Sequence, residues 1–356
     1  MANIAVLSFY SGIVDRGVEA FVYEISKRLK VKHQLSIFQA GEKIQNPQIK
    51  TYLIKSFADI PKSSKSVLSK FYLDWQSIKI LIFSLQAISK IISGKYQVII
   101  LMNGGWQTVI YRIVSKLTNA KIIISGQAGI GSDDAFNLLF RPDTFVSLTT
   151  SQLKWAQNIT PEVNAIHIPN GVNLAVFNPE VKPINISLKT PIVVCASALV
   201  PNKRVDLTIR AVAKNKNMSL LLLGDGQLAG NLDTLGKRLL SKRYLRVLTP
   251  YVEMPKYYRA GDVFTLASKN EAFGISYIEA MACNLPVVTT NDDSRQEIIG
   301  NAGILTDPVN INQYARDLSI AVKTNYRNIP YDQALKFSWN NIAKKYSRLI
   351  NELIKK

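Results

Sequence analysis

Residues 192–206 read IVVCASALVPNKRVD, and this stretch decides the fold class. The five apolar residues 192–196 predict a short buried strand, and Asp206 lies in the first turn of an expected helix over 206–213. A strand, a short loop and a helix in this order form the repeating unit of parallel sheets that are covered by helices on both faces. The stretch therefore predicts α/β architecture, which the rest of the chain can test.

The same alternation extends along the chain on both sides of this stretch. Short apolar runs alternate with helical patterns, among which residues 18–29, 254–259, 275–283, 311–322 and 339–354 are the clearest. Such alternation is typical of parallel sheets. The predicted strands are 4–9, 35–38, 98–102, 122–125, 145–148, 166–168, 192–196, 220–223, 246–248, 263–267 and 287–290.

The chain has 356 residues, which is too long for one ordinary core, so two domains are expected. Residues 178–189 interrupt the alternation with Pro179 and Pro183 and are interpreted as a linker. We therefore predict two Rossmann-like doubly wound parallel-sheet domains, 1–182 and 188–337. Ligands of two such sheets usually bind in the cleft between them.

The composition favours a folded protein with anionic partners. The chain is 47% apolar and 19% charged, and its formal net charge is +19. This charge is compatible with nucleic acid, anionic lipid or a phosphate-bearing substrate, but no nucleic-acid-binding motif is present, so nucleic acid is the least favoured partner. Two cysteines and two histidines predict neither a disulfide framework nor a metal cluster. The first residues resemble a strand rather than a signal peptide, and no run of 18 uncharged apolar residues occurs, so a cytoplasmic protein is expected.

Residues 61–95 fit this plan less well than the rest. They combine six lysines with Phe71, Tyr72, Trp75 and Phe83, and residues 77–93 are strongly apolar. One interpretation is a buried crossover helix of the first domain. The other is a basic, aromatic-rich surface that lies on a membrane or binds a lipid-linked acceptor. The sequence leaves both open.

The candidate site centres on two carboxylates, Glu271 and Glu279, which lie eight residues apart. Glu271 belongs to a turn that ends at Gly274, and Glu279 lies one turn inside the following helix. Helical side chains lean toward the N-terminus, so Glu279 can approach the helix end that Glu271 flanks. That end offers free amide N–H groups and a positive dipole, which suit a sugar joined to a phosphate. The alternative for Glu279 is a capping box with Ser276.

Two further segments add phosphate-binding chemistry. Lys203 stands where a predicted strand gives way to a helix, and from there an ammonium group can reach a bound phosphate. Gly224 belongs to the turn Leu222-Leu223-Gly224-Asp225-Gly226, where the backbone can approach a flat ligand.

Several motifs in order resemble one known family. They are the segment 270–282 with both glutamates, Pro286-Val287-Val288, residues 294–303 and Pro169-Asn170-Gly171-Val172-Asn173. Over residues 165–310 the chain resembles the retaining glycosyltransferases of the GT-B fold known as family 4. The resemblance implies two Rossmann-like domains facing a cleft, with residues 338–356 as a helix that packs back on the N-terminal domain.

The resemblance also implies roles for individual residues. Glu271 would hold hydroxyls of the donor sugar, Lys203 would neutralise the diphosphate as it departs, and Gln127 would stand where the family often has a catalytic histidine. Glu279 would hold the ribose of the donor. The remaining nucleotide-binding positions would be Phe273, Gly274, Ile275, Ser276, Gly224, Gly17 and Val252.

The implied activity is transfer of a sugar, with retention, from a UDP- or GDP-sugar to a glycan or lipid-linked acceptor. No metal is expected, because charged side chains and helix ends generally replace it in this family and the sequence has no Asp-x-Asp motif. One departure is Ala198, where the family usually has arginine; Arg204 could replace that contact or point to solvent. The alternatives are a non-catalytic sugar-nucleotide-binding protein, or a basic membrane- or nucleic-acid-associated protein on the same fold.

Overall fold

The computed structural model describes residues 1–13, 17–44, 46–55 and 72–355, which form two compact units. Unit 1 comprises Met1–Asn170 and Trp339–Lys356, and unit 2 comprises Gly171–Ser338. The first domain was predicted to end at residue 182, but its boundary lies after Asn170. The reason is packing, since Val172 N–H donates to Phe337 O at 2.8 Å and Phe177 is fully buried within unit 2.

Unit 1 is built on a seven-stranded sheet in the order β3-β2-β1-β4-β5-β6-β7, with every pairing parallel. The chain reverses its direction of progress between the neighbours β1 and β4, which makes this pair the switch point of the sheet. The strands are β1 (Asn3–Ser8), β2 (Gln34–Gln39), β3 (Lys50–Leu53), β4 (Val98–Leu101), β5 (Lys121–Ser125), β6 (Thr144–Ser147) and β7 (Ala165–His167).

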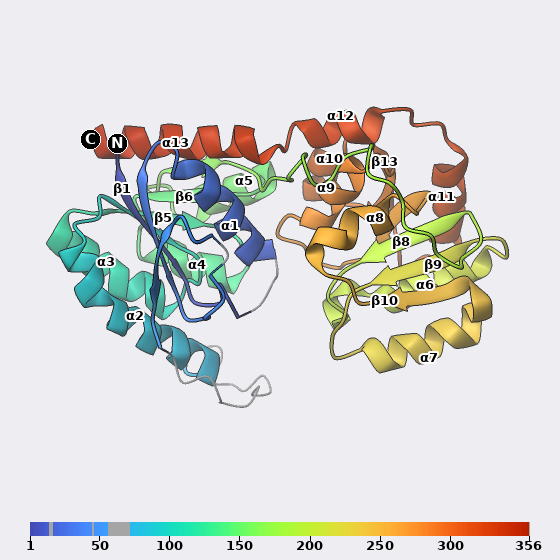
Figure 1. Cartoon of the computed structure of the whole chain (residues 1–356), viewed down its shortest axis with the longest axis horizontal. Helices are drawn as coiled ribbons and strands as arrows, with labels where there is room; N and C mark the ends of the chain where they lie inside the picture. Colours follow the sequence, from blue (N-terminus) through green and yellow to red (C-terminus); the bar gives the residue numbers. More distant parts are fainter. Residues whose placement is uncertain (14–16, 45, 56–71, 356) are drawn as a thin grey trace. The chain divides into compact units, whose positions relative to one another are not determined.

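Helices cover both faces of this sheet because successive strand residues point to opposite sides (Figure 1). Ile4 and Val6 of β1 pack with α1 and α13 on one face, whereas Ala5 and Leu7 pack toward α2, α3, α4 and α5 on the other. The C-terminal helix α13 thus belongs to unit 1. The helices are α1 (Gly17–Leu29), α2 (Trp75–Ser93), α3 (Trp106–Thr118), α4 (Ser132–Leu139), α5 (Thr150–Ile159) and α13 (Trp339–Lys355).

Unit 2 repeats the plan with six parallel strands in the order β10-β9-β8-β11-β12-β13, so its switch point lies between β8 and β11. The helices α6, α7 and α11 pack together, and α8, α10 and α12 pack around α9. The strands are β8 (Ile192–Ala196), β9 (Ser219–Leu223), β10 (Tyr244–Val247), β11 (Val263–Leu266), β12 (Val287–Thr290) and β13 (Gly303–Thr306). The helices are α6 (Val205–Lys214), α7 (Ala229–Leu240), α8 (Met254–Tyr258), α9 (Ile275–Ala282), α10 (Asp293–Ile299), α11 (Ile311–Lys323) and α12 (Ile329–Leu335).

The predicted fold class, two doubly wound parallel sheets, is confirmed, and of the described strands the sequence missed β3 and β13. Both β3 and β13 lie at sheet edges and are partly solvent-exposed, so they lack the continuous apolar run that marks a buried parallel strand. Of the ambiguous stretch 61–95, residues 61–71 lie outside the described part of the chain. Its remainder includes the whole of α2, which buries one face but leaves Leu85 and Ile92 half exposed.

Candidate functional site

The predicted site residues of unit 2 gather at the carboxyl ends of two neighbouring strands. The loop after β8 carries Lys203, and the loop after β11 carries Glu271 and leads into α9. These strands are far apart in sequence but adjacent at the switch point, which is where open α/β sheets bind ligands. The topology alone therefore explains why residues almost 70 positions apart meet.

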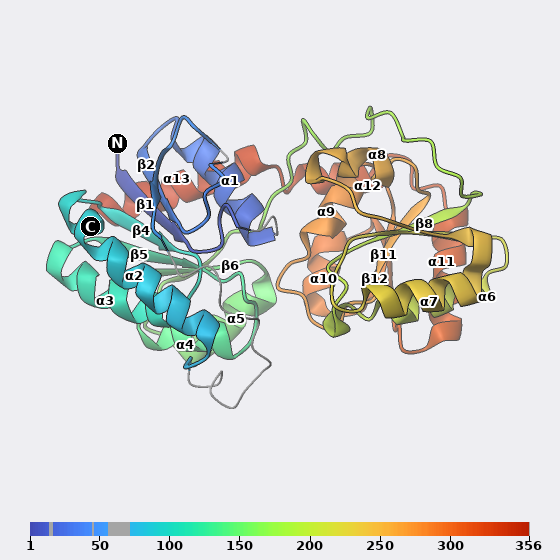
Figure 2. The same ribbon diagram turned by 60° about the horizontal axis from the view of Figure 1, so that its bottom comes forward.

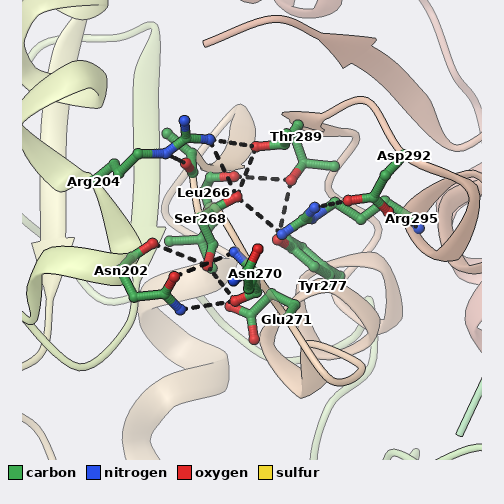
Figure 3. A network of polar contacts seen from close by, with 12 residues as sticks. Asn202, Arg204, Leu266, Ser268, Asn270, Glu271, Tyr277, Thr289, Asp292 and Arg295 are labelled. Atoms are coloured by element: carbon green, nitrogen blue, oxygen red, sulfur yellow. Dashed lines mark hydrogen bonds and ion pairs between the residues drawn. The ribbon is translucent and has the colours of Figure 1, made fainter. Parts of the chain in front are cut away.

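Hydrogen bonds fasten these two loops to each other (Figure 3). The Asn202 side chain donates to Asn270 O at 2.8 Å and accepts from Asn270 N–H at 3.3 Å. The backbone N–H of Lys269 donates to Asn202 O at 2.9 Å. Asn202 thus acts as a bridge that fixes the spacing of the loops. Sequence reasoning missed it, because its partners lie 68 residues away.

The bridge brings the Lys203 ammonium into an ion pair with the carboxylate of Glu271. Their side chains are 20% and 12% exposed, so both charges are largely shielded from water, yet each can still be reached from solvent. A partly buried pair is held in one geometry more firmly than a surface pair. The structure therefore brings together the residues predicted to act on the sugar and on the diphosphate.

Helix α9 begins immediately after this pair, at a glycine with left-handed backbone. Gly274 has φ +85°, and a Cβ there would lie 2.3 Å from Cε2 of Tyr277. No side chain caps the helix start, so the first-turn amides, including those of Ile275 and Ser276, are not used by a cap. Phe273 is buried and packs edge-on against Phe337 at 5.7 Å. The glycine is thus required by the turn itself.

The capping-box alternative for Glu279 is wrong. The helix starts at Ile275 rather than Ser276, and the Glu279 carboxylate accepts hydrogen bonds from the hydroxyls of Tyr251 at 2.7 Å and Tyr258 at 3.1 Å. Glu279 is only 4% exposed, and burial raises its pKa to about 7 despite both bonds. A carboxylate held at this cost next to a helix start is a candidate for binding hydroxyl groups.

The two tyrosines form a wall beside Glu279. Tyr258 is fully buried, whereas Tyr251 is 44% exposed, and Phe177 packs against both rings at 6.0 and 5.4 Å. No local pattern connects Tyr251 with Glu279, since they are 28 residues apart. Val252, predicted to contact the nucleotide, follows Tyr251 and is 68% exposed.

Two arginines, Arg204 and Arg295, hold the loop after β11 by hydrogen bonds to its backbone carbonyls. Arg204 donates to Ala267 O at 2.7 Å and to Ser268 O at 3.3 Å. Arg295 is 1% exposed and donates to Ser268 O at 2.9 Å and to the Tyr277 hydroxyl at 3.1 Å (Figure 3). Arg204 thus does not point to solvent, and its replacement of the contact missing at Ala198 stays a prediction. Its guanidinium is used to hold the loop.

Gly224 follows β9, and its backbone conformation and the close approach of a neighbouring loop explain why glycine stands there. It has φ +138°, and a Cβ would lie 2.0 Å from Ser197 O. The same applies to Gly226, where a Cβ would lie 2.6 Å from Leu199 O. These close approaches bring the turn after β9 against the loop after β8. The predicted contact of Gly224 with a nucleotide stays a prediction.

The two remaining predicted residues, Gly17 and Gln127, belong to unit 1. Gly17 is the exposed first residue of α1, and the residues 14–16 before it lie outside the described part of the chain. Gln127 exchanges two amide hydrogen bonds with Asn170, both 3.0 Å long, and donates to Ser125 Oγ at 2.9 Å. Its side chain is therefore fixed, but by protein groups, and its catalytic role stays a prediction.

The loop that carries Gln127 is anchored by a buried aspartate. Asp134 is 1% exposed and accepts from Gly129 N–H at 3.0 Å and from the Gln152 amide at 3.0 Å. Burial raises its pKa to about 7. Gly131 precedes α4, and no side chain caps the start of this helix. Asp134 instead holds the loop before the helix.

Comparison with known proteins identifies a family that part of this chain matches. Residues 177–337 match the model of the family glycosyl transferases group 1. A probable sucrose-phosphate synthase from Thermosipho melanesiensis is 28% identical over 232 residues, which cover 59% of this chain and 54% of that protein. The chain thus spans about half the length of this curated relative. The O-antigen chain mannosyltransferase B from Escherichia coli is 34% identical over a stretch that covers 28% of this chain and 27% of that protein.

Solved structures match over nearly the whole chain. A sucrose-phosphate synthase from Thermosynechococcus elongatus has a TM-score of 0.82 at 18% identity, with both chains covered completely. HepE from Anabaena, solved with UDP and glucose, has a TM-score of 0.79 at 16% identity and covers 99% of this chain and 100% of its own. At these identities the likeness shows the fold, which is that of GT-B glycosyltransferases.

Proposed function

We propose that this chain, of which residues 177–337 match the glycosyl transferases group 1 family, is an enzyme that transfers a sugar from a nucleotide-diphosphate sugar to a glycan or lipid-linked acceptor. Relatives named as mannosyltransferases and a neighbour solved with UDP and glucose support a sugar-nucleotide donor. We propose UDP- or GDP-sugars as the donors.

The observation that carries the proposal is the contiguity of three groups in unit 2. Glu271 with its partner Lys203, the uncapped start of α9 at Gly274 and the buried Glu279 follow one another along the chain after β11. Their order matches the order of parts in the donor, which are sugar, diphosphate and ribose. Carboxylates accept hydrogen bonds from sugar hydroxyls, and an ammonium with free amides binds phosphate.

Each residue then has a chemical task. Glu271 accepts hydroxyl bonds from the donor sugar, and its pairing with Lys203 places the ammonium beside the sugar–phosphate bond. Lys203 and the α9 amides stabilise the negative charge that grows on the leaving diphosphate. We propose that these fixed charges supply the stabilisation without a metal ion.

We further propose that the configuration at the anomeric carbon is retained through a front-face reaction. The bond from the anomeric carbon to the diphosphate oxygen breaks, and the acceptor oxygen bonds to the same face of that carbon. The acceptor proton passes to the departing diphosphate. Lys203 stays close to that oxygen throughout, which favours the departure.

The test is release of a nucleoside diphosphate by the purified full chain. UDP- and GDP-sugars are incubated singly with a mixture of glycan and lipid-linked acceptors, and product anomers are identified by NMR. We expect release with at least one donor, abolished by Glu271→Gln and retained in the control Lys269→Gln, an exposed neighbour in the same loop. Binding without release selects the non-catalytic alternative, and absence of both contradicts the proposal.

A further inference from the structure

A buried polar cluster joins three loops at one edge of the sheet of unit 1. Its members are Asp134, Asn137 and Gln152, which are 1%, 4% and 1% exposed. They reach the segments that follow β4, β5 and β6, and the helices α3, α4 and α5, which begin after these strands, lie on one face of the sheet (Figures 1 and 2). These segments follow the carboxyl ends of parallel strands, where ligands of open α/β sheets bind.

The side chain of Asn137 is oriented by the loop after β4. Its Oδ1 accepts from Gly105 N–H at 3.1 Å and from the Thr108 hydroxyl at 2.9 Å. Because a backbone N–H fixes the position of this oxygen, the NH2 group faces Asp134, and Nδ2 donates to Asp134 Oδ1 at 3.3 Å. Gly104 leaves room for the amide, since a Cβ there would lie 2.7 Å from Asn137 Nδ2.

The side chain of Gln152 is oriented in the same way by the segment after β6. Its Oε1 accepts from Leu148 N–H at 2.8 Å, so its NH2 group faces the loop after β5. Nε2 donates to Gly126 O at 2.8 Å and to Asp134 Oδ2 at 3.0 Å. Glycine is required at position 126 for this contact, because a Cβ would lie 2.5 Å from Gln152 Nε2.

Three N–H donors therefore converge on the carboxyl group of Asp134. The third is the backbone N–H of Gly129, which donates to Oδ2 at 3.0 Å. The charged or titratable groups that face Asp134 are Asp133 and Tyr72, whose hydroxyl donates to Asp133 Oδ1 at 3.0 Å, and neither is a cation. Because all three partners are donors, the cluster is complete only when Asp134 is an ionised acceptor.

The loop that this cluster holds carries Gln127. Gly126 precedes it, Gly129 follows two residues later, and both are bound by the cluster. We propose that Asp134 is a positioning residue whose ionised carboxylate fixes residues 126–131 and, with them, Gln127. This role rests on the proposed transfer reaction and on the predicted part of Gln127 in it.

Protonation of Asp134 weakens this hold on the loop. An oxygen that carries a proton accepts poorly, and its O–H group needs an acceptor that Asn137, Gln152 and Gly129 do not offer. Burial raises the pKa of Asp134 to about 7, so both forms coexist near neutral pH. The loop is therefore fixed above this pH and held less firmly below it.

NMR of the full chain labelled with 15N-glycine tests the hold without any substrate. The Gly129 amide proton should change its chemical shift as Asp134 loses its proton, because the hydrogen bond becomes charge-assisted. We expect one step with a midpoint near pH 7, and Asp134→Asn should abolish it. Asparagine has the size of aspartate, but its NH2 group would face another donor.

A second variant and a matched control keep this test decisive if Asp134→Asn folds poorly. Asn137→Ala removes one donor to the carboxylate, so the midpoint should rise by about 1 pH unit. The control Asp143→Asn removes a carboxylate of unit 1 that accepts from Ile122 N–H at 2.9 Å just before β6 begins. It should leave the step at Gly129 unchanged, and circular dichroism checks that all variants are folded.

Kinetics separate positioning from a purely structural role. With the donor and acceptor found by the release assay, Asp134→Asn should lower kcat about tenfold at pH 8. The KM of the donor should change less than about twofold, since the proposed donor contacts belong to unit 2, and titration of Glu279 acts on that KM. Lowering the pH to 6 should lower the kcat of the unaltered chain in the same way, and Asp143→Asn should match the unaltered chain at both pH values.

The two measurements fail separately. Absence of a step at Gly129, or a step that persists in Asp134→Asn, overturns the proposal whether or not the chain transfers sugar. An unchanged kcat of Asp134→Asn overturns it as well. If the unaltered chain shows the step but turns over no donor, the proposed function fails, and with it the role of Asp134 in the reaction.

Discussion

Replacing Glu279 by glutamine isolates the energetic cost of the buried carboxylate. In the folded chain its pKa is about 7, raised by burial from an ordinary value of 4.5. The unfolded chain releases this proton near pH 4.5 and the folded chain only near pH 7, so the folded state binds more protons between these values. The free energy of unfolding therefore falls as pH rises through this window. A shift of about 2.5 pH units corresponds to about 3 kcal/mol.

Glu279→Gln should remove this fall, because glutamine fills the same space, still accepts from one tyrosine hydroxyl and does not titrate. Relative to the unaltered chain, the variant should gain up to about 3 kcal/mol of stability between pH 4.5 and 8. The assay is urea unfolding at several pH values, followed by far-ultraviolet circular dichroism.

The chain contains its own control for this experiment. All four tryptophans, Trp75, Trp106, Trp155 and Trp339, belong to unit 1, so their fluorescence reports that unit. The pKa of Asp134 is also raised to about 7 by burial. The free energy of unfolding of unit 1 should therefore also fall as pH rises, and Glu279→Gln should leave that fall unchanged. If the free energy of unfolding measured by circular dichroism falls with pH as steeply in the variant as in the unaltered chain, Glu279 is not the source of this pH dependence.

Three further substitutions test the site. Ala198→Arg should tighten binding of a nucleoside diphosphate about tenfold in calorimetric titrations if the phosphate lies beside the loop after β8; unchanged or weaker affinity would place the phosphate elsewhere. Gly274→Ala should lower the free energy of unfolding by about 2 kcal/mol, because alanine is strained at φ +85° and its Cβ would meet Tyr277; urea unfolding with a loss below 0.5 kcal/mol would contradict this. Arg295→Met should cost about 2 to 3 kcal/mol in the same assay, since Ser268 O loses a buried charged donor; an undiminished midpoint would show that this hydrogen bond is dispensable.

The sequence was sufficient for the fold wherever the physical signal is local. Buried parallel strands such as β8 are continuous apolar runs, and α9 follows Gly274 directly, so both were predictable. The edge strands β3 and β13 were not predictable, because half-exposed strands lack continuous apolar runs. The domain boundary was misplaced for a related reason: proline marks a break in regular structure, but Phe177 shows that the chain already packs in unit 2.

The candidate site was predictable in its chemistry but not in its contacts. Lys203 and Glu271 were identified from residue type and position, and the adjacency of β8 and β11 brings them together. The Tyr251 and Tyr258 bonds to Glu279 join residues more than 20 positions apart. The use of Arg204 as a loop anchor likewise depends on backbone carbonyls after β11. Contacts of this kind follow from tertiary packing and leave no trace in a short motif.

Calorimetric titration of the full chain with UDP and GDP measures whether unit 2 holds a nucleotide-sugar donor site. We expect at least one of them to bind, and Lys203→Gln to weaken this binding at least about tenfold because a charged contact to phosphate is lost. The control Lys269→Gln removes a neighbouring exposed lysine and should bind as the unaltered chain does. If neither nucleotide binds, or if both variants lose the same affinity, Lys203, Glu271 and the start of α9 do not form a donor site.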